Sequence, residues 1–192
     1  MVSPLDLNQL QLRAPGLQLH PPSQALAEAI LAYHLRNQAF LAPWSPRVRP
    51  AFFTLTAQAE KIQSERRQMQ ARRLLKFWLM PDNPAETDVI GHVALSNIVW
   101  GGFRSGYLGY SVDQAHLRRG HARAAVAALV DYAFGHLKLH RMEANIMPRN
   151  QASIKVVTPL GFEYEGLSPK YLRINGQWED HAHYVLRNRA LE

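Results

Sequence analysis

The spacing of apolar and polar residues along the chain predicts an alternation of helices and short strands. Stretches with an apolar residue at every third or fourth position indicate helices, and short apolar or alternating runs bounded by turn residues indicate strands. The predicted helices begin at Ser23 or Gln24, where Leu26, Ile30 and Tyr33 share one face, and cover residues 56–74, 119–137 and 150–160. The predicted strands cover residues 17–20, 75–80, 88–99, 107–113, 141–147, 162–166, 171–174 and 182–187.

Proline, glycine and asparagine separate these elements. The cluster Pro43–Pro46 ends the first helix, and Pro81–Pro84 predicts the turn of a hairpin. Three glycines at positions 101, 102 and 106 predict another turn, and Gly161 ends the last helix. Asn175-Gly176 indicates a tight hairpin, because both residues tolerate positive φ angles.

The order of elements predicts an α/β (α+β) domain with a mixed sheet that is mostly antiparallel in its first half. Residues 1–16, which contain Pro4, Pro15 and Gly16, predict a loose N-terminal leader. Residues 17–192 contain neither an internal repeat nor a linker, so we expect one domain there.

Composition narrows the class of protein. A chain of 192 residues with 47% hydrophobic and 19% charged residues is long and apolar enough for one globular domain with a core. Cysteine is absent, which excludes disulfides, thiolate catalysis and cysteine-based metal sites, and agrees with a reducing cytoplasm. No run approaches the ~20 apolar residues of a membrane span, and no signal peptide opens the chain. We therefore expect a cytoplasmic protein with no membrane partner.

The net charge of +7 favours an anionic partner such as a polyphosphate cofactor, ribosomal RNA or an acidic surface. The densest basic region is Lys61–Lys76, whose charges recur at helical spacing. Such a pattern is typical of the solvated face of an amphipathic helix, with a nucleic-acid surface as the alternative. Aromatic interleaving, a recognition helix and zinc spacing are missing, so we expect no DNA partner.

The segment from Arg118 to Ala124 carries the clearest candidate chemistry. It reads Arg-Arg-Gly-His-Ala-Arg-Ala and joins a predicted strand to an alanine-rich helix. The first four amides of a helix lack intrahelical partners, and small residues let a phosphate approach them. Neither G-x-x-x-x-G-K-S/T nor a G-x-G-x-x-G that opens a βαβ unit occurs, which excludes two common nucleotide sites. We predict a cradle for a phosphorylated cofactor; the alternative is that small residues only permit close packing.

Three motifs in order resemble the GCN5-related N-acetyltransferase (GNAT) superfamily. Arg119–Ala124 is similar to its phosphate-binding motif Q/R-x-x-G-x-G/A, with Ala122 in place of the central glycine. Asn150–Ser153 resembles the N-x-x-S motif, and Leu160–Gly166 resembles L-G-F-x-x-E-G. The segments that are similar to the RimJ/RimL group, and within it to the RimJ branch, are Asn37–Trp44, Ile90–Val99, Tyr107–Ser111 and Tyr171–His181. The resemblance covers roughly residues 17–188.

The resemblance implies a fold, a cofactor and a set of binding residues. The fold is a single GNAT-type domain whose sheet is flanked by helices and splayed between its fourth and fifth strands, and the cofactor is acetyl-CoA. Main-chain groups near Val112 and Gln114 would hold the pantetheine arm like an added strand. The implied cofactor-binding residues are Val112, Gln114, Arg119, Gly120, His121, Ala122, Arg123, Ala124, Asn150 and Ser153.

Direct attack of an amine on the thioester needs no protein nucleophile, which suits a chain without cysteine. By resemblance, Asn150 would bond the pantetheine or thioester region and Ser153 would give a proton to the leaving thiolate. The alternative for Asn150 is a helix cap, and both roles are compatible.

An α-amino group has a pKa of about 7.7–8.0, so a base or water relay is useful at neutral pH. The candidates are Glu163, Glu165, Asp180 and His181, with the last two favoured by their place beside the final strand. Each is otherwise a surface ion-pair or turn residue. The RimL-branch carboxylate corresponds to Leu172 here, so that base is not carried over.

The resemblance places Phe40, Trp44, Asn97, Tyr110 and Tyr171 at the slot for the acceptor's tail, although loop aromatics otherwise belong to local core. The pairs His136 with His140 and His181 with His183 bring no evident third ligand, so we expect no metal site.

The leading hypothesis is transfer of an acetyl group from acetyl-CoA to a protein N-terminus, most specifically the N-terminal alanine of a ribosomal small-subunit protein. The partner is then a ribosomal protein or the ribosomal subunit, and the enzyme a monomer or homodimer. One alternative is a small-molecule acetyltransferase acting on an aminoglycoside, polyamine or amino acid. Another, permitted by the positive charge, is a ribosome- or RNA-binding assembly factor.

Overall fold

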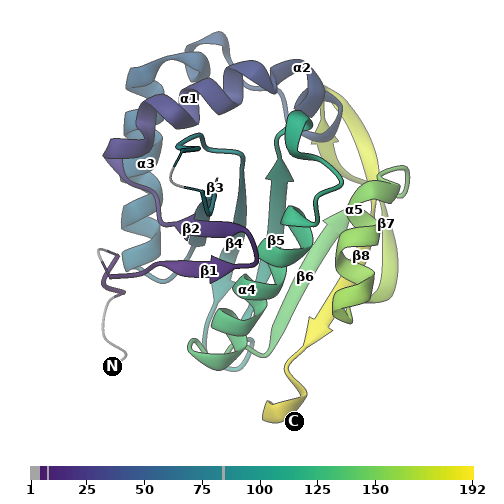
Figure 1. Cartoon of the computed structure of the whole chain (residues 1–192). Helices are drawn as coiled ribbons and strands as arrows, with labels where there is room; N and C mark the ends of the chain where they lie inside the picture. Colours follow the sequence, from purple (N-terminus) through teal and green to yellow (C-terminus); the bar gives the residue numbers. More distant parts are fainter. Residues whose placement is uncertain (1–4, 8, 84) are drawn as a thin grey trace.

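Within residues 5–7, 9–83 and 85–192, which the computed structural model describes, eight strands form one open sheet (Figure 1). The strands are β1 Leu12–Ala14, β2 Leu17–His20, β3 Leu75–Pro81, β4 Gly91–Val99, β5 Ser105–Val112, β6 Arg141–Ile146, β7 Glu163–Ile174 and β8 Gln177–Arg187. They lie in the order β1-β2-β3-β4-β5-β6-β8-β7, and every pair is antiparallel except β5 with β6. The predicted mixed, mostly antiparallel sheet is confirmed.

Five α-helices and several short 3-10 turns connect these strands in the described part of the chain. The helices are α1 Ala27–Arg36, α2 Gln38–Leu41, α3 Leu55–Gln70, α4 His121–Gly135 and α5 Gln151–Val157. Side chains explain where two of them begin. Thr54 caps α3 by accepting the Ala57 amide at 3.3 Å, and Asn150 caps α5 by accepting the Ser153 amide at 3.1 Å.

Helices cover both faces of the sheet because its central strands are apolar on both sides. Leu75, Phe77 and Leu79 of β3 belong to the large core that includes α4 and α5. Trp78, which points the other way, belongs to a second core with Ile30 of α1 and Ile62 of α3. Figure 1 shows α4 in front of the middle of the sheet and α5 to its right beside β7 and β8, with α1 along the top and α3 at the left.

The N-terminal segment differs from the loose leader predicted for residues 1–16. Leu12–Ala14 form β1, which pairs with β2 and packs against α4. Leu7 is buried and belongs to the same large core as β3 and α4. Residues 1–4 and 8 lie outside the described residues, as does Pro84 of the predicted 81–84 turn.

Several predicted boundaries were wrong for identifiable reasons. Gly106 lies inside β5, where a Cβ atom would meet Leu95 at 2.8 Å, so this glycine makes room for packing. The predicted strands 162–166 and 171–174 form one strand, β7, with an irregularity between Ser168 and Leu172. The Asn175-Gly176 hairpin is confirmed, with φ angles of 44° and 85°.

Candidate active site

The sheet splays where β5 and β6 stop pairing. These parallel strands are in register from Ser105 with Arg141 to Leu108 with Ala144, and then diverge. β5 continues to Val112, and β6 continues to Ile146. The gap falls between the fourth and fifth predicted strands, as the resemblance implied; the additional strand β1 raises their numbers by one.

Main-chain groups of β5 face this gap. The Asp113 amide donates to the Ile90 carbonyl at 2.7 Å, on the side of β4. Because main-chain groups alternate between the two sides of a strand, those of Val112 and Tyr110 point toward the gap. Val112 therefore lies where a main-chain donor was predicted.

Gln114, the other predicted donor, is already bonded. Its amide donates to Oδ1 of Asn37 at 3.0 Å, and Asn37 is a buried residue at the end of α1. In this structure the amide supports the loop after β5, and the contact of Gln114 with the pantetheine arm stays a prediction. Sequence spacing gave no sign of Asn37, because 77 residues separate the partners.

Asp113 fixes the path from β5 to α4. Its buried carboxylate accepts from Arg36 Nε at 2.5 Å, from Asn37 Nδ2 at 2.9 Å and from the Ala115 amide at 2.9 Å. Burial alone would raise the pKa of Asp113, but the bonds from Asn37, Ala115 and Arg36 lower it below its usual value. The carboxylate is thus charged at neutral pH and ties this loop to α1.

The predicted cradle is formed at the start of α4. Gly120 occupies the N-cap position with φ +80°, a left-handed conformation that favours glycine. The Ala124 amide donates to the Gly120 carbonyl at 3.0 Å, which leaves the His121, Ala122 and Arg123 amides without intrahelical acceptors. A Cβ atom on Gly120 would meet nothing within 4 Å, so open space adjoins these donors. Exposed Arg119 and Arg123 flank them.

A hollow of about 400 Å³ borders the cradle. Arg119 and Arg123 line it from the side of α4, and Arg13, Ala14 and Pro15 line it from β1 and the following turn. Arg13 was not predicted as a site residue, because its segment was expected to be loose. A larger hollow of about 550 Å³ shares no lining residue with the cradle.

Ser153 lies against Tyr110 on the α5 side of the gap. The two hydroxyl oxygens are 2.7 Å apart, and the Tyr110 hydroxyl is also 2.9 Å from the Ser153 carbonyl oxygen. Burial raises the pKa of Tyr110 to about 12, with an opposing effect from the Ser153 hydrogen bond, so the phenol keeps its proton at neutral pH. Tyr110 was predicted at the acceptor's tail; the structure instead groups it with Ser153. Asn150 caps α5, which is the alternative role that the sequence analysis gave for it.

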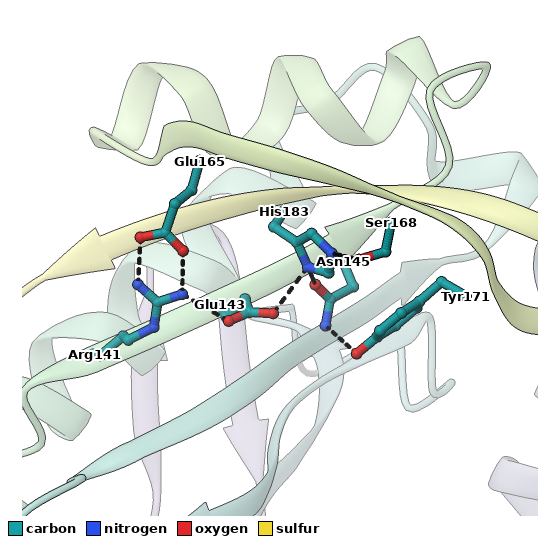
Figure 2. A network of polar contacts seen from close by, with 7 residues as sticks. All are labelled: Arg141, Glu143, Asn145, Glu165, Ser168, Tyr171 and His183. Carbon is teal, nitrogen blue, oxygen red and sulfur yellow. Dashed lines mark hydrogen bonds and ion pairs between the residues drawn. The ribbon is translucent and has the colours of Figure 1, made fainter.

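The opposite face of the sheet carries a polar network that sequence analysis did not predict (Figure 2). His183 of β8 has Nδ1 3.0 Å from Glu143 Oε1 and 2.5 Å from Asn145 Oδ1, both on β6. Its Nε2 lies 2.7 Å from Ser168 Oγ on β7. Tyr171 closes one end of the network: its ring centroid is 5.2 Å from that of His183.

The four candidate bases predicted from sequence have structural partners. Glu163 pairs with Arg189 at 3.2 Å, and Glu165 makes two bonds to Arg141 at 2.8 and 2.6 Å. Asp180 Oδ1 accepts the Lys170 amide at 2.8 Å and so holds the irregular part of β7. His181 is buried, with Nδ1 3.1 Å from the Glu179 carbonyl. These contacts favour structural roles for all four residues over proton transfer.

We call the face of the sheet that carries the His183 network the open face. Of the residues predicted at the acceptor's tail, Tyr171 lies on it. Phe40 lies half-buried in α2, and Trp44 ends the next turn with the Arg149 guanidinium 4.9 Å from its ring. Tyr171 belongs to the His183 network. Asn97 occupies a bulge in β4 with φ +50°, and within the described residues no hydrogen bond joins it to the other three.

The loop after α2 and the β7–β8 hairpin meet over this face. The Asn175 amide donates to the Ser45 carbonyl at 2.9 Å, and Arg149 bonds both Glu179 at 2.8 Å and the Pro43 carbonyl at 3.1 Å. These bonds connect the loop after α2 to the β7–β8 hairpin.

Within the described residues, no three or more His, Cys, Asp or Glu side chains are grouped as metal ligands would be. No helix among those residues is both long and apolar enough to cross a lipid bilayer.

Comparison with known proteins gives consistent results. Residues 17–163 match the model of the acetyltransferase (GNAT) domain. A relative from Bacillus subtilis (strain 168), the probable N-acetyltransferase YjcK, is 32% identical over 177 residues, covering 92% of this chain and 97% of the relative.

Two solved structures are also similar. The ribosomal-protein-S5-alanine acetyltransferase of Vibrio fischeri is 33% identical, with a TM-score of 0.90 over 96% of this chain and 100% of that one. RimJ of Mycobacterium smegmatis, solved in complex with CoA-disulfide, is 29% identical, with a TM-score of 0.86 over 95% of this chain and 88% of that one.

Proposed function

Because the chain belongs to the acetyltransferase (GNAT) family and takes its acetyl group from acetyl-CoA, we propose that its acceptor is a protein N-terminus, specifically the N-terminal alanine of a ribosomal small-subunit protein. The observation that carries this proposal is the likeness to the S5-alanine acetyltransferase of Vibrio fischeri, which extends over the whole of that chain. It includes both the splayed strands and the open face where an acceptor would lie.

The residues of the gap suit the acetyl donor. The free amides at the start of α4 and the open space beside Gly120 match a diphosphate, and the β5 edge at Val112 matches the amide-rich pantetheine arm. Acetyl-CoA, when bound, supplies an activated thioester. The protein's share is then mainly orientation, which supplies on the order of 7–11 kcal/mol in the best cases.

Ser153 and Tyr110 are placed to deliver a proton to a leaving sulfur. The single Tyr110 hydroxyl hydrogen has two acceptors, the Ser153 carbonyl oxygen at 2.9 Å and Ser153 Oγ at 2.7 Å. When it points to Oγ, the Ser153 hydrogen is free to point into the gap. Asn150 contributes by holding the first turn of α5, because its side chain fixes the Ser153 amide. Both of the roles considered for Asn150 are then served by one conformation.

We expect Tyr110→Phe to lower kcat about 2- to 12-fold while the KM for acetyl-CoA changes little. The ring stays in place, but Ser153 loses a hydrogen-bond donor of the strength that contributes about 0.5–1.5 kcal/mol. Steady-state kinetics at saturating acetyl-CoA measure the effect, with Tyr132→Phe in α4 as the matched control. An unchanged kcat in Tyr110→Phe would count against the paired role.

The charges on the open face favour a peptide over a polycation. Glu143 and Glu165 are bonded to Arg141, and Glu179 is bonded to Arg149, so arginines neutralise these carboxylates. A polyamine or aminoglycoside needs several uncompensated carboxylates, whereas a peptide N-terminus brings one positive charge. This supports the protein acceptor among the possible amines.

A peptide panel tests the proposal. Purified protein, labelled acetyl-CoA and peptides that begin with Ala, Ser or Met are incubated, and the products are sequenced by mass spectrometry. We expect acetylation of the alanine N-terminus and none of a peptide with a blocked N-terminus and an internal lysine. Transfer to a polyamine, aminoglycoside or free amino acid with none to any peptide would reject the protein acceptor.

The assembly-factor alternative has its own test. Association with ribosomal subunits is measured at increasing salt for the wild type and for Arg119→Glu, which reverses a charge at the cradle. Salt-sensitive association that persists unchanged in a variant unable to bind acetyl-CoA would favour a role apart from acetyl transfer.

A further inference from the structure

His183 has ring nitrogens with partners of opposite kinds (Figure 2). Nδ1 faces two acceptors, the Glu143 carboxylate at 3.0 Å and the Asn145 amide oxygen at 2.5 Å. Nδ1 therefore carries the ring hydrogen, and in the neutral imidazole the lone pair is on Nε2. Nε2 lies 2.7 Å from Ser168 Oγ, whose hydroxyl then donates to it. Hydrogen bonds thus connect Ser168 through His183 to Glu143, and one proton can move along this chain.

This path borders the place where β5 and β6 separate. Asn145 directly follows Ala144, the last β6 residue paired with β5, and Asn145 pairs with His183 in the β6–β8 register. The side chains of Glu143 and His183 are 14% and 16% exposed, so the pair is largely removed from water while staying at the surface of the face. No candidate base named from the sequence is so placed.

We infer that Ser168 and His183 take the proton from the acceptor amine, with Glu143 and Asn145 as positioning residues. The inference rests on the proposed function, since it concerns the same reaction. Arg141 bonds Glu143 at 2.7 Å and so fixes the carboxylate that faces Nδ1. The chain would then hold its base in three neighbouring strands, far apart in sequence.

The step balances as follows. Ser168 Oγ accepts a proton from the bound ammonium as its own hydroxyl hydrogen passes to His183 Nε2, which becomes an imidazolium beside the Glu143 carboxylate. The freed nitrogen lone pair forms the N–C bond to the acetyl carbon. The C–S bond breaks with its electron pair on sulfur, and the sulfur accepts the hydrogen of Ser153. The second proton, which the nitrogen must lose to become an amide, passes to Ser153 Oγ and restores its hydroxyl, while the first proton remains on His183.

Other charged or titratable groups surround this histidine and belong to the same electrostatic unit. From the strands packed against it they are Arg141 and Glu143 on β6, Glu165 and Tyr171 on β7, Tyr107 on β5, and His181 and Arg187 on β8. Burial, with smaller effects of Tyr107 and Glu143, raises the pKa of Tyr171, so this phenol keeps its proton at neutral pH.

The pH profile of His183→Gln tests the inference. Without a base, only the neutral amine reacts, so kcat/KM for the alanine peptide should fall below the amine pKa of about 7.7–8.0. The wild type removes the proton within the complex and holds its rate to lower pH. We expect His183→Gln to lose about 20-fold at pH 6.5, the ratio of total to neutral amine there, and less than about 3-fold at pH 9.

Three companion variants sharpen the result. Ser168→Ala, which removes a single hydroxyl, should move the acid limb in the same direction, and it decides the matter if His183→Gln does not fold. His136→Gln, at the C-terminal end of α4, is the matched histidine control and should leave the profile unchanged. His92→Gln tests the other histidine near the gap, whose Nδ1 is 2.8 Å from Ser111 Oγ on β5.

If His183→Gln lowers kcat/KM by the same factor at every pH, and the acid side of the pH profile does not move, His183 has a structural role and the inference is overturned. An acid limb that moves in His92→Gln and not in His183→Gln would also overturn it. Both outcomes leave acetyl transfer to the peptide intact in the wild type. Absence of transfer from wild-type protein to any peptide would instead refute the proposed acceptor.

Discussion

Gly120→Val is expected to weaken acetyl-CoA binding by about 100-fold or more. Gly120 has φ +80° and ψ −2°, where a β-branched residue is strained by roughly 1–2 kcal/mol. Its side chain would also enter the open space in front of the His121, Ala122 and Arg123 amides. Loss of two hydrogen bonds to a charged phosphate, at about 1.5–3 kcal/mol each, already corresponds to 100-fold in Kd.

Gly101→Val is the matched control. Gly101 also has a left-handed φ, +75°, and a Cβ atom there would likewise meet nothing within 4 Å. It lies in the β4–β5 turn, at the opposite end of β5 from the start of α4. Calorimetric titration with acetyl-CoA and thermal melting compare both variants. We expect equal destabilisation but lost affinity in Gly120→Val alone; equal affinities in the two variants would refute the cradle.

Features set by local sequence were predictable. The cap at Asn150, the hairpin at Asn175-Gly176 and the strand-to-helix junction at Gly120 each depend on neighbouring residues, and each was found at its predicted place. The mixed sheet followed from the order of elements, and its splay between the fourth and fifth predicted strands followed from the resemblance. Local rules failed at Gly106, because the reason for that glycine is the side chain of Leu95 on the next strand.

The polar network could not be predicted, because its members meet only through strand register. Glu143 and Asn145 alternate along β6 and His181 and His183 along β8, so each strand shows a polar face in the sequence. Which residue opposes which depends on the pairing of Asn145 with His183, 38 positions apart. The sequence therefore presented His181 and His183 together only as a possible metal site, and His181 alone as a candidate base.

The basic region Lys61–Lys76 also contains a contact between separate elements that the sequence pattern did not predict. Lys76 is not on the helix surface: it lies in β3, 5% exposed, and bonds Glu65 of α3 at 2.6 Å. Lys61 bonds the same carboxylate oxygen at 2.7 Å, and the Lys76 ammonium lies 4.3 Å from the Trp78 ring centroid. Part of the predicted cationic face is thus an ion-paired group beneath α3.

Glu65→Gln is expected to lower the free energy of unfolding by about 3–5 kcal/mol, because it leaves the buried Lys76 charge without a counter-ion. In a chain of this length that corresponds to roughly 6–20 °C in Tm. Urea unfolding and thermal melting measure it, with Glu60→Gln, at an exposed position on the same helix, as the control. A change of less than about 1 kcal/mol would show that Lys76 keeps its charge without help from Glu65.

The pH dependence and a double variant separate charge from packing. Burial, then the Lys61 charge, lowers the pKa of Lys76 below 10.5, so the folded state sheds its proton before the unfolded state does. Stability from this group therefore rises with pH up to about 10.5, and more steeply in Glu65→Gln, where the attraction of Glu65 is gone. The deficit of the variant should shrink between pH 7 and 9.5. Replacing both residues by methionine removes the stranded charge and should restore stability to within about 1 kcal/mol; a double variant as unstable as Glu65→Gln would point to lost packing instead.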